Sequence, residues 1–407
     1  MIASKPRIGT AFFLSLMLAA ALKDDAEGLL ESTYWADLSI HPTLSLIKEH
    51  SIYFLLIATI LGLFIFAKNV NFSLRITSAS VFVLILAFAP ILRASYLDTA
   101  IIHKFIQAFS LTFFIVLVGW RITSSHGALA LKQELSNAFY WLSVILITAN
   151  FLNMAFGHGF APNNSRLFGT TTHPNFLGVQ LAICNIAISS RVFELSFSQW
   201  KQYIAQAMLL LSGLFMLLLT GSRTGFLVML VGISTLWLAR KGFRVSFLTI
   251  LALTILVATF VFFAIYADAD STFYRGENGV NTRSSAWSSM LDLIKERPWI
   301  GHGRFIGQSE NSFLRSMIAF GIPYGLLLFA TIIYSLVRLY RLSWKYRTEH
   351  TSPEHLHFSL LTALITGAVF EGYLIDSWSL PRLTFIILAL ACLSRRSSSS
   401  HYPNQSN

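Results

Sequence analysis

The sequence has few charged residues and few cysteines for its length. Charged residues make up 12% of the 407 positions, whereas hydrophobic residues make up 55%. A water-soluble domain of this size carries about twice that share of charge, so the composition excludes an ordinary soluble fold. Cys184 and Cys392 both lie inside apolar segments, and no disulfide framework is indicated. The eleven histidines show no metal-ligand spacing, so we expect no metal site.

What the sequence has in quantity is apolar runs long enough to cross a bilayer. A helix of about 20 apolar residues spans the hydrocarbon core. Within that core every backbone N–H and C=O needs an internal partner, and for runs of this length a helix provides it. The sequence therefore predicts an all-α, polytopic membrane bundle of about twelve transmembrane helices, at about 9–22, 51–67, 76–92, 105–120, 138–156, 174–190, 203–219, 224–240, 246–267, 312–337, 357–375 and 380–394.

The distribution of basic residues predicts the orientation of this bundle. With a cytoplasmic N-terminus, the cytoplasmic segments carry 17 of the 30 Lys and Arg residues but only 4 of the 19 Asp and Glu residues. Such an excess of Lys and Arg is typical of cytoplasmic loops. The asymmetry explains the net charge of +11 as a topology signal. We therefore expect membrane lipids, and no nucleic acid, among the partners.

The chain shows no internal repeat and no separate soluble domain. We expect one membrane-embedded domain over residues 1–396 and a disordered, Ser-rich tail at 397–407. Longer outer segments occur at 23–50, which is acidic and irregular, at 157–173, and at 268–311 between the ninth and tenth helices. The first run resembles a removable signal peptide as well as a membrane helix, and we expect it to be a retained helix.

The large outer loop at 268–311 has a helical pattern of its own. Trp287, Met290, Leu291 and Ile294 follow one another at the spacing of one face of a helix. Asn281 or Thr282 can cap the start of this helix and Pro298 ends it. The pattern predicts a surface helix with Arg283 in its first turn. Because a cation is unfavourable near a helix N-terminus, we expect Arg283 to have an anionic partner.

Three arginines fall on the predicted outer face: Arg166, Arg223 and Arg283. Arg223 lies in the short turn Thr220-Gly221-Ser222-Arg223-Thr224-Gly225 between two apolar runs. A guanidinium binds phosphate oxygens through two parallel hydrogen bonds. The three arginines therefore indicate a site for an anionic, lipid-borne substrate. The alternative is that they are interfacial arginines that extend toward lipid headgroups.

Other polar residues stand at the outer ends of the predicted helices. His173 and Asn175 flank Pro174 at the start of the sixth run, and the pair Glu310-Asn311 precedes the tenth. Glu310 is a candidate general base, although each of these positions also fits a helix cap. Two further acids, Glu371 and Asp376, lie near the outer end of the eleventh run, where pairing with Arg382 is the simpler account.

These motifs occur in an order that resembles the O-antigen ligase and polymerase superfamily, membrane glycosyltransferases of bacterial envelopes. The ordered motifs cover residues 160–340: Arg166…Gly169…His173-Pro174-Asn175, then Ser222-Arg223, then Arg283-x-x-x-Trp287, Pro298-x-x-Gly301-x-Gly303, Asn311 and Phe320-Gly321-Ile322-x-x-Gly325. The ligases of this family carry a His-Asn pair where this chain has Glu310-Asn311. That departure leaves room for a polymerase, toward which the sequence leans slightly.

The resemblance implies transfer of a glycan from an undecaprenyl-diphosphate carrier at the periplasmic face of the bacterial inner membrane. The acceptor is a growing carrier-linked glycan or lipid A-core, and neither cofactor, metal nor nucleotide sugar takes part. By this resemblance Arg223 and Arg283 hold the diphosphate, Glu310 acts as base, and Arg166, His173, Asn175, Ser222 and Asn311 bind substrate. The acceptor hydroxyl attacks the anomeric carbon from the opposite face, which inverts it.

Two other classes of function fit the composition. A transporter or flippase of lipid-linked glycans would carry ionisable groups along a pathway through the membrane, whereas the arginines here gather at the outer mouth. A non-catalytic partner of a polysaccharide assembly machine would tolerate the loss of Arg223 and Glu310.

Overall fold

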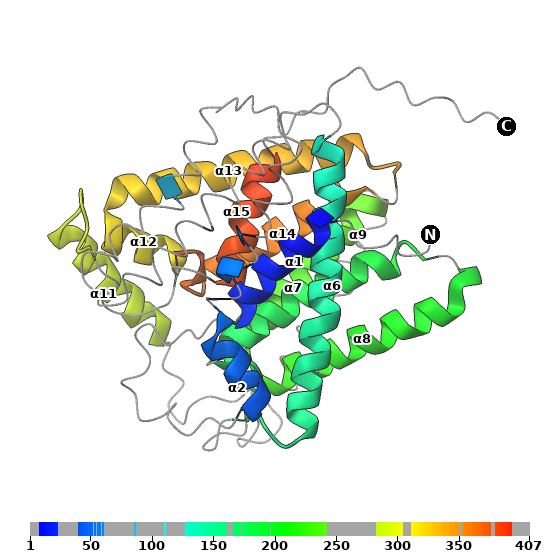
Figure 1. Cartoon of the computed structure of the whole chain (residues 1–407). Coiled ribbons are helices and arrows are strands. Elements are labelled where there is room, and N and C mark those ends of the chain that lie inside the picture. Colours follow the sequence, from blue (N-terminus) through cyan, green and yellow to red (C-terminus); the bar gives the residue numbers. More distant parts are fainter. Residues whose placement is uncertain are drawn as a thin grey trace, which may run out of the picture.

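The computed structural model describes residues 8–22, 40–51, 53, 55–57, 59–60, 85–86, 110, 127–160, 166–171, 173–195, 197–241, 282–303, 311–349, 352–375 and 379–392. Within these ranges the regular structure is helical, and one isolated antiparallel bridge joins Phe160 to Leu167. The helices, labelled in Figure 1, are α1 (Ile8–Leu22), α2 (Pro42–Glu49), α6 (Gly127–Ala155), α7 (Pro174–Val192), α8 (Trp200–Leu219), α9 (Arg223–Lys241), α11 (Thr282–Glu296), α12 (Ser312–Phe320), α13 (Ile322–Lys345), α14 (Pro353–Ala368) and α15 (Leu380–Cys392), with 3₁₀ turns at Phe197–Gln199 and Tyr373–Ile375.

Four of the described helices are long and apolar enough to cross a membrane. They are Leu131–Ala155 of α6, Trp200–Leu219, Arg223–Arg240 of α9, and Ile322–Lys345. The helical membrane fold predicted from the sequence is thus confirmed at the level of its class. The count of twelve spans stays a prediction, because the runs at 51–67, 76–92, 105–120 and 246–267 lie mostly or wholly outside the described residues, as does the tail at 397–407.

Two segments differ from the sequence prediction. The tenth run, predicted as one helix over 312–337, is two helices, because the chain breaks at Gly321 with φ of 87°. Such a backbone suits glycine, which lacks a Cβ. The outer segment 23–50, predicted as irregular, ends in the helix α2, with Pro42 in its first turn. The predicted surface helix over 282–296 is present as α11.

Main-chain hydrogen bonds join the end of α11 to the junction of α12 and α13. The amide of Ile322 donates to the Pro298 carbonyl, and the amides of His302 and Gly303 donate to the carbonyls of Ile318 and Ala319. A Cβ at Gly321 would collide with the Trp299 carbonyl oxygen. A small cluster in which Met290 and Ile294 pack with Ile318 completes this contact between α11 and α12.

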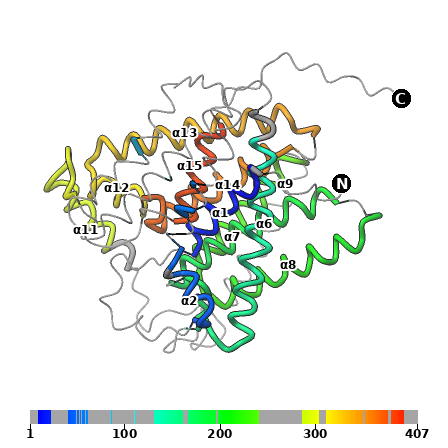
Figure 2. The backbone as a smooth tube through the Cα atoms, in the orientation of Figure 1, coloured from blue at the N-terminus to red at the C-terminus, as the bar shows by residue number. Residues whose placement is uncertain are grey.

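Helix α7 lies at the centre of the described bundle, in contact with α6, α8, α9 and α14 (Figures 1 and 2). Most of its residues are buried, including Gln180 and Asn185. Helix α1 packs against α6 and α15, and its side chains Phe13, Leu16 and Met17 are buried. In contrast, α8 exposes large hydrophobic side chains such as Met208, Leu211 and Phe215. The exposed face of α8 is therefore suited to lipid.

Two glycines set the distance between α7 and α9. A Cβ on Gly225 would lie 2.6 Å from the backbone carbon of Gly178, and a Cβ on Gly178 would lie 2.5 Å from the Cβ of Ser222. Any larger residue would force the helices apart. Small residues allow membrane helices to approach closely enough for their backbones to pack. The backbones of the two helices are therefore in contact at the start of α9.

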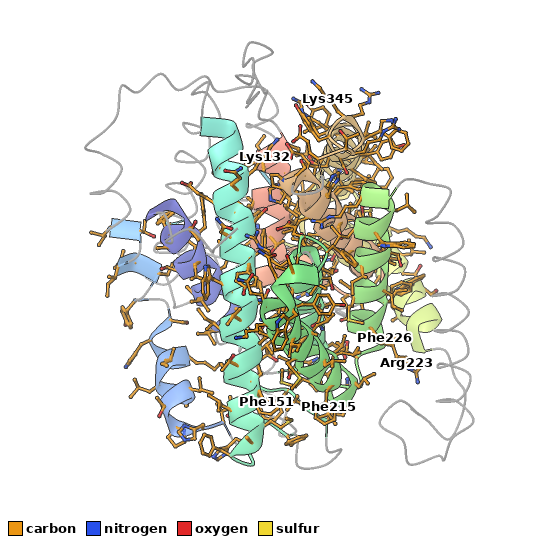
Figure 3. The ribbon with its side chains drawn as sticks, turned by 90° about the vertical axis from the view of Figure 1, so that its right-hand side faces the viewer. Lys132, Phe151, Phe215, Arg223, Phe226 and Lys345 are labelled. Carbon is orange, nitrogen blue, oxygen red and sulfur yellow. The ribbon has the colours of Figure 1, made fainter. Side chains whose placement is uncertain are left out.

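The two ends of the bundle carry different groups. Figure 3 shows Lys132 and Lys345 at one end, and Phe151, Phe215 and Arg223 at the other. The sequence predicts the first of these ends to be cytoplasmic. There Lys132 Nζ lies 3.2 Å from Glu354 Oε1, and both side chains are buried.

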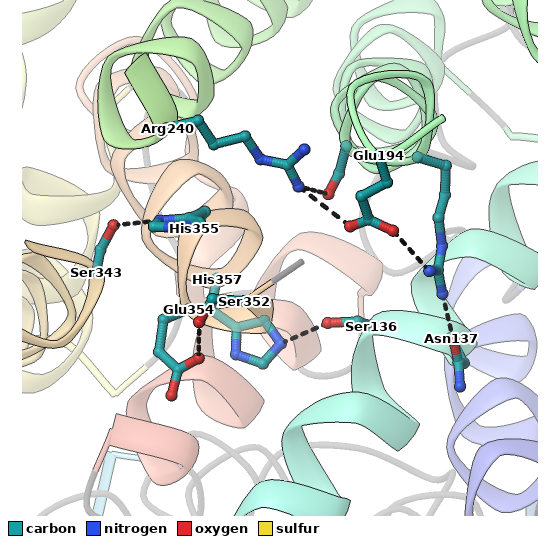
Figure 4. A network of polar contacts seen from close by, with 11 residues as sticks. Ser136, Asn137, Glu194, Arg240, Ser343, Ser352, Glu354, His355 and His357 are labelled. Carbon is teal, nitrogen blue, oxygen red and sulfur yellow. Dashed lines mark hydrogen bonds and ion pairs between the residues drawn. The ribbon is translucent and has the colours of Figure 1, made fainter. Parts of the chain in front are cut away.

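Figure 4 shows a second set of polar contacts, between α6, α7 and α9. Arg240 pairs with Glu194 at 3.1 Å and also donates to the Ser190 hydroxyl. Glu194 in turn pairs with Arg191, which donates to Asn137 of α6. Together with the Lys132–Glu354 pair, these contacts join the predicted cytoplasmic ends of α6, α7, α9 and α14.

We expect Glu354→Leu to destabilise the protein by about 3–5 kcal/mol, because it leaves the Lys132 ammonium buried without its partner. The double variant Lys132→Met/Glu354→Leu removes both charges and should recover most of that loss. Thermal unfolding of the purified protein in detergent measures both effects, with the exposed Lys345→Met as control. Equal unfolding temperatures for the single and double variants would contradict this account of the pair.

Candidate functional site

Arg166 joins the segment before α7 to the turn between α8 and α9. Its Nε donates to the carbonyl of Thr220 at 2.7 Å, and the Leu167 amide donates to the Leu219 carbonyl at 3.0 Å. The Arg166 side chain is only 4% exposed, so its guanidinium is a buried charge. A second nitrogen, Nη2, donates to Asn175 Oδ1 at 3.0 Å. Arg166 therefore fixes the α8–α9 turn against the start of α7.

The start of α7 presents Asn175 to this arginine. His173 is the N-cap residue, and its Nδ1 accepts a hydrogen bond from the Asn175 amide at 3.0 Å. Pro174 follows in the first turn, where its fixed φ suits a helix. The predicted exposure of His173 and Asn175 at the mouth of the sixth run is only partial, since both side chains are half-buried.

Glu371 is the acceptor at the centre of the cluster. Its Oε1 accepts a hydrogen bond from Asn175 Nδ2 at 3.0 Å and another from the Thr224 hydroxyl at 3.1 Å. The Asn175 amide therefore lies between a cation and a carboxylate. It points its oxygen at Arg166 and its nitrogen at Glu371, the orientation that satisfies both charges. A chain of hydrogen bonds thus runs from Arg166 through Asn175 and Glu371 to Thr224.

The start of α12 also contacts Glu371. The Ser312 hydroxyl donates to the Glu371 main-chain carbonyl at 2.6 Å and accepts from the Leu374 amide at 3.2 Å. Asn311 Oδ1 accepts from the amides of Phe313 and Leu314, which caps α12. Asn311 also has a positive φ of 71°, which asparagine tolerates better than most residues. The predicted substrate ligand Asn311 thus has a capping role in the structure.

The start of α9 is built in a similar way. The buried Ser222 hydroxyl accepts from the Gly225 amide at 3.1 Å, so Ser222 is the N-cap of α9. Arg223 is the first residue of that helix, and its side chain is exposed, in contrast to Arg166. A helix N-terminus favours anions through its free N–H groups and its dipole. Here the exposed guanidinium of Arg223 lies beside the N-terminus of α9.

The remaining two predicted residues are less fully described. Arg283 lies in the first turn of α11, as the sequence predicts, and its side chain lies outside the described residues. Glu310 also lies outside them, directly before Asn311 in the chain. The described cluster therefore brings together Arg166, His173, Asn175, Ser222, Arg223 and Asn311 from four separate segments.

Sequence reasoning assigned Glu371 to a pair with Arg382 and did not single out Thr224. In the structure an Arg382 guanidinium nitrogen donates to the Leu86 carbonyl at 3.1 Å. Glu371 accepts a hydrogen bond from Asn175 in the cluster described above. Asp376 lies outside the described residues. The signal for Glu371 was present, because an ionisable residue near the end of a membrane run is functional or paired by default. Thr224 carries no such signal beyond its place next to Arg223.

Comparison with known proteins adds two matches. A family model described as O-antigen ligase matches residues 207–330, a range that holds Arg223, Arg283, Glu310 and Asn311. The O-antigen ligase of Pseudomonas aeruginosa is 28% identical over 247 residues, which are 54% of this chain and 58% of that relative. The alignment thus spans less than two thirds of the relative's length. Together the two matches confirm the resemblance of this chain to the O-antigen ligase and polymerase superfamily.

Proposed function

We propose that the chain is a membrane glycosyltransferase that moves an oligo- or polysaccharide from an undecaprenyl-diphosphate carrier to an acceptor hydroxyl. The reaction takes place at the periplasmic face of the bacterial inner membrane, inverts the anomeric carbon and needs no metal. The observation that carries the proposal is the polar cluster of Arg166, Asn175, Glu371 and Thr224 beside the exposed Arg223. The two family matches support the same class of reaction.

Arg223 is the residue we assign to the diphosphate. Its exposed side chain and the N-terminus of α9 offer positive potential at one point. Negative charge builds on the diphosphate as the bond to the anomeric carbon breaks. Fixed donors aimed at that charge lower the barrier more than they stabilise the bound donor lipid. Arg283, in the first turn of α11, is the second cation that the resemblance implies for this role.

Glu371 has a positioning role in this proposal. Its Oε1 already accepts hydrogen bonds from Asn175 and Thr224, so this oxygen is engaged by the protein. Through Thr224 it fixes the first turn of α9 and therefore the neighbouring Arg223. Arg166 acts with it from the other side of Asn175.

The general base is then Glu310. It stands one residue before Asn311, whose neighbour Ser312 donates to the main chain of Glu371. A carboxylate at this place accepts the proton of the acceptor hydroxyl as the hydroxyl oxygen attacks the anomeric carbon. A base of this kind contributes about 10²–10⁴-fold to a rate.

The acceptor distinguishes a ligase from a polymerase. The family model and the relative both carry the description O-antigen ligase, which favours ligation. Glu310 in place of the histidine of the ligases favours the polymerase. Deletion of the gene, followed by analysis of the glycans left on the undecaprenyl-diphosphate carrier, separates the two. Long finished chains on the carrier indicate a ligase, and single repeat units indicate a polymerase. An unchanged pool of carrier-linked glycans would overturn both.

We expect Arg223→Lys to lower turnover by about 10- to 100-fold, since lysine keeps the charge but loses the two-pronged grip on phosphate. The deletion strain complemented with the variant is the assay, and membrane levels of the protein are measured in parallel. Lys201→Arg, at the other end of α8, is the matched control and should leave turnover unchanged. Normal turnover in Arg223→Lys would remove this residue from the site.

Glu310 and Glu371 have different proposed roles, so we expect their substitutions to have different effects. Glu310→Gln should reduce turnover by at least about 100-fold, because the base is lost. Glu371→Gln keeps the size and one acceptor, so we expect about a tenfold loss while the acidic limb of the pH–rate profile stays in place. The measurement is the pH dependence of transfer in purified protein, with Glu349→Gln as control. Loss of the acidic limb in Glu371→Gln would make Glu371 the base instead.

A further inference from the structure

Helix α13 carries a groove that plays no part in the proposed transfer reaction. Its volume is about 730 Å³, and the side chains Phe329, Ile333, Tyr334, Val337, Arg338 and Arg341 contribute to its wall. Three of these apolar side chains, Phe329, Ile333 and Val337, are 52%, 43% and 43% exposed. They follow one another at intervals of four residues, so they form one stripe along the helix. The groove is thus open along a membrane-spanning helix.

Charge is confined to one end of this groove. Arg338 and Arg341 stand three residues apart, which makes them neighbours on the helix surface. Two like charges in that position repel, and an anion that contacts both relieves the repulsion. Among the described residues, no ion pair joins Arg338 or Arg341 to a carboxylate. The anion that matches this end is therefore one from outside the described bundle.

Arg338 is held in place by two contacts. Its Nε donates to the carbonyl of Cys392 at the end of α15, and its Nη1 donates to the Tyr334 hydroxyl at 3.3 Å. Arg338 and Arg341 precede Lys345 on α13, in the half of that helix that ends where Figure 3 shows Lys132 and Lys345. The apolar stripe, from Val337 back to Phe329, covers about 12 Å of helix at a rise of about 1.5 Å per residue.

We propose that this groove binds an anionic phospholipid of the cytoplasmic leaflet. The headgroup phosphate contacts Arg338 and Arg341, and one acyl chain lies along Val337, Ile333 and Phe329. The position of the charged end of the groove distinguishes an anionic phospholipid from a carrier-linked donor. A carrier-linked donor has its diphosphate at the Arg223 end of the bundle, opposite the two arginines, so its charged group would meet the apolar part of the groove. The exclusion of the carrier-linked donor rests on the proposed function, whereas the match of the groove to a phospholipid does not.

The test is native mass spectrometry of the purified protein in detergent, titrated with dioleoylphosphatidylglycerol or dioleoylphosphatidylcholine. We expect phosphatidylglycerol to bind more tightly than phosphatidylcholine. Arg341→Gln should weaken phosphatidylglycerol binding about fivefold, the effect of one basic residue at a lipid surface. Lys345→Gln removes the same charge outside the groove and should change binding by less than about twofold.

A second variant tests the apolar part. Val337→Trp fills the groove from its exposed side and should reduce phosphatidylglycerol binding while the unfolding temperature stays at the wild-type value. Equal binding of the two lipids, or an equal loss in Lys345→Gln and Arg341→Gln, would overturn the headgroup site. Undiminished binding in Val337→Trp would overturn the acyl-chain site. A dimer that Val337→Trp abolishes would show that a second copy of the chain occupies the groove.

Discussion

The contact between Gly178 and Gly225 determines how closely α7 and α9 approach. The hydrogen-bonded cluster of Arg166, Asn175, Glu371 and Thr224 depends on that distance. Asn175 lies one turn before Gly178, and Thr224 directly precedes Gly225, so both donors to Glu371 lie next to this backbone contact. A wider separation would leave a carboxylate in the bundle with fewer partners, and buried charges are costly when unpaired. The same contact places Arg223 at the rim, where it is exposed.

Helix α14 connects the two polar regions of the bundle. It begins beside Glu354, which pairs with Lys132, and ends three residues before Glu371. Both carboxylates are buried and have hydrogen-bond partners on other helices. The helix is thus fixed at each end by a charge with specific partners, and between these ends the Ser359 hydroxyl donates to the Gly232 carbonyl of α9. If α14 moved along its axis, Glu354 and Glu371 would lose these partners. The two carboxylates therefore fix the position of α14 along its axis.

The sequence allowed the class of fold and most of the outer residues to be predicted, because long apolar runs and charges at their ends are local signals. Arg166, Asn175 and Arg223 were placed on one face by topology alone, and α11 by its helical spacing. The break at Gly321 was missed, since a glycine inside an apolar run is compatible with a continuous membrane helix. The hydrogen bonds of Glu371 to Asn175 and Thr224 were not predicted, because these partners come from α7 and α9, about 150 to 200 residues away in the chain, and that packing leaves no mark in local sequence.

The junction at Gly321 has a consequence for sequence variation. The end of α11 is held against α12 and α13 by main-chain hydrogen bonds from His302, Gly303 and Ile322, which any residue except proline can make. The geometry of the junction also depends on glycines, since Gly301, Gly303 and Gly321 all have positive φ and a Cβ on Gly301 would lie 2.6 Å from the Ala319 carbonyl. Relatives can exchange exposed side chains of α11, such as Leu291, without moving this junction, provided that these glycines remain. Such a frame lets the exposed surface of α11 vary while its junction with α12 and α13 stays the same.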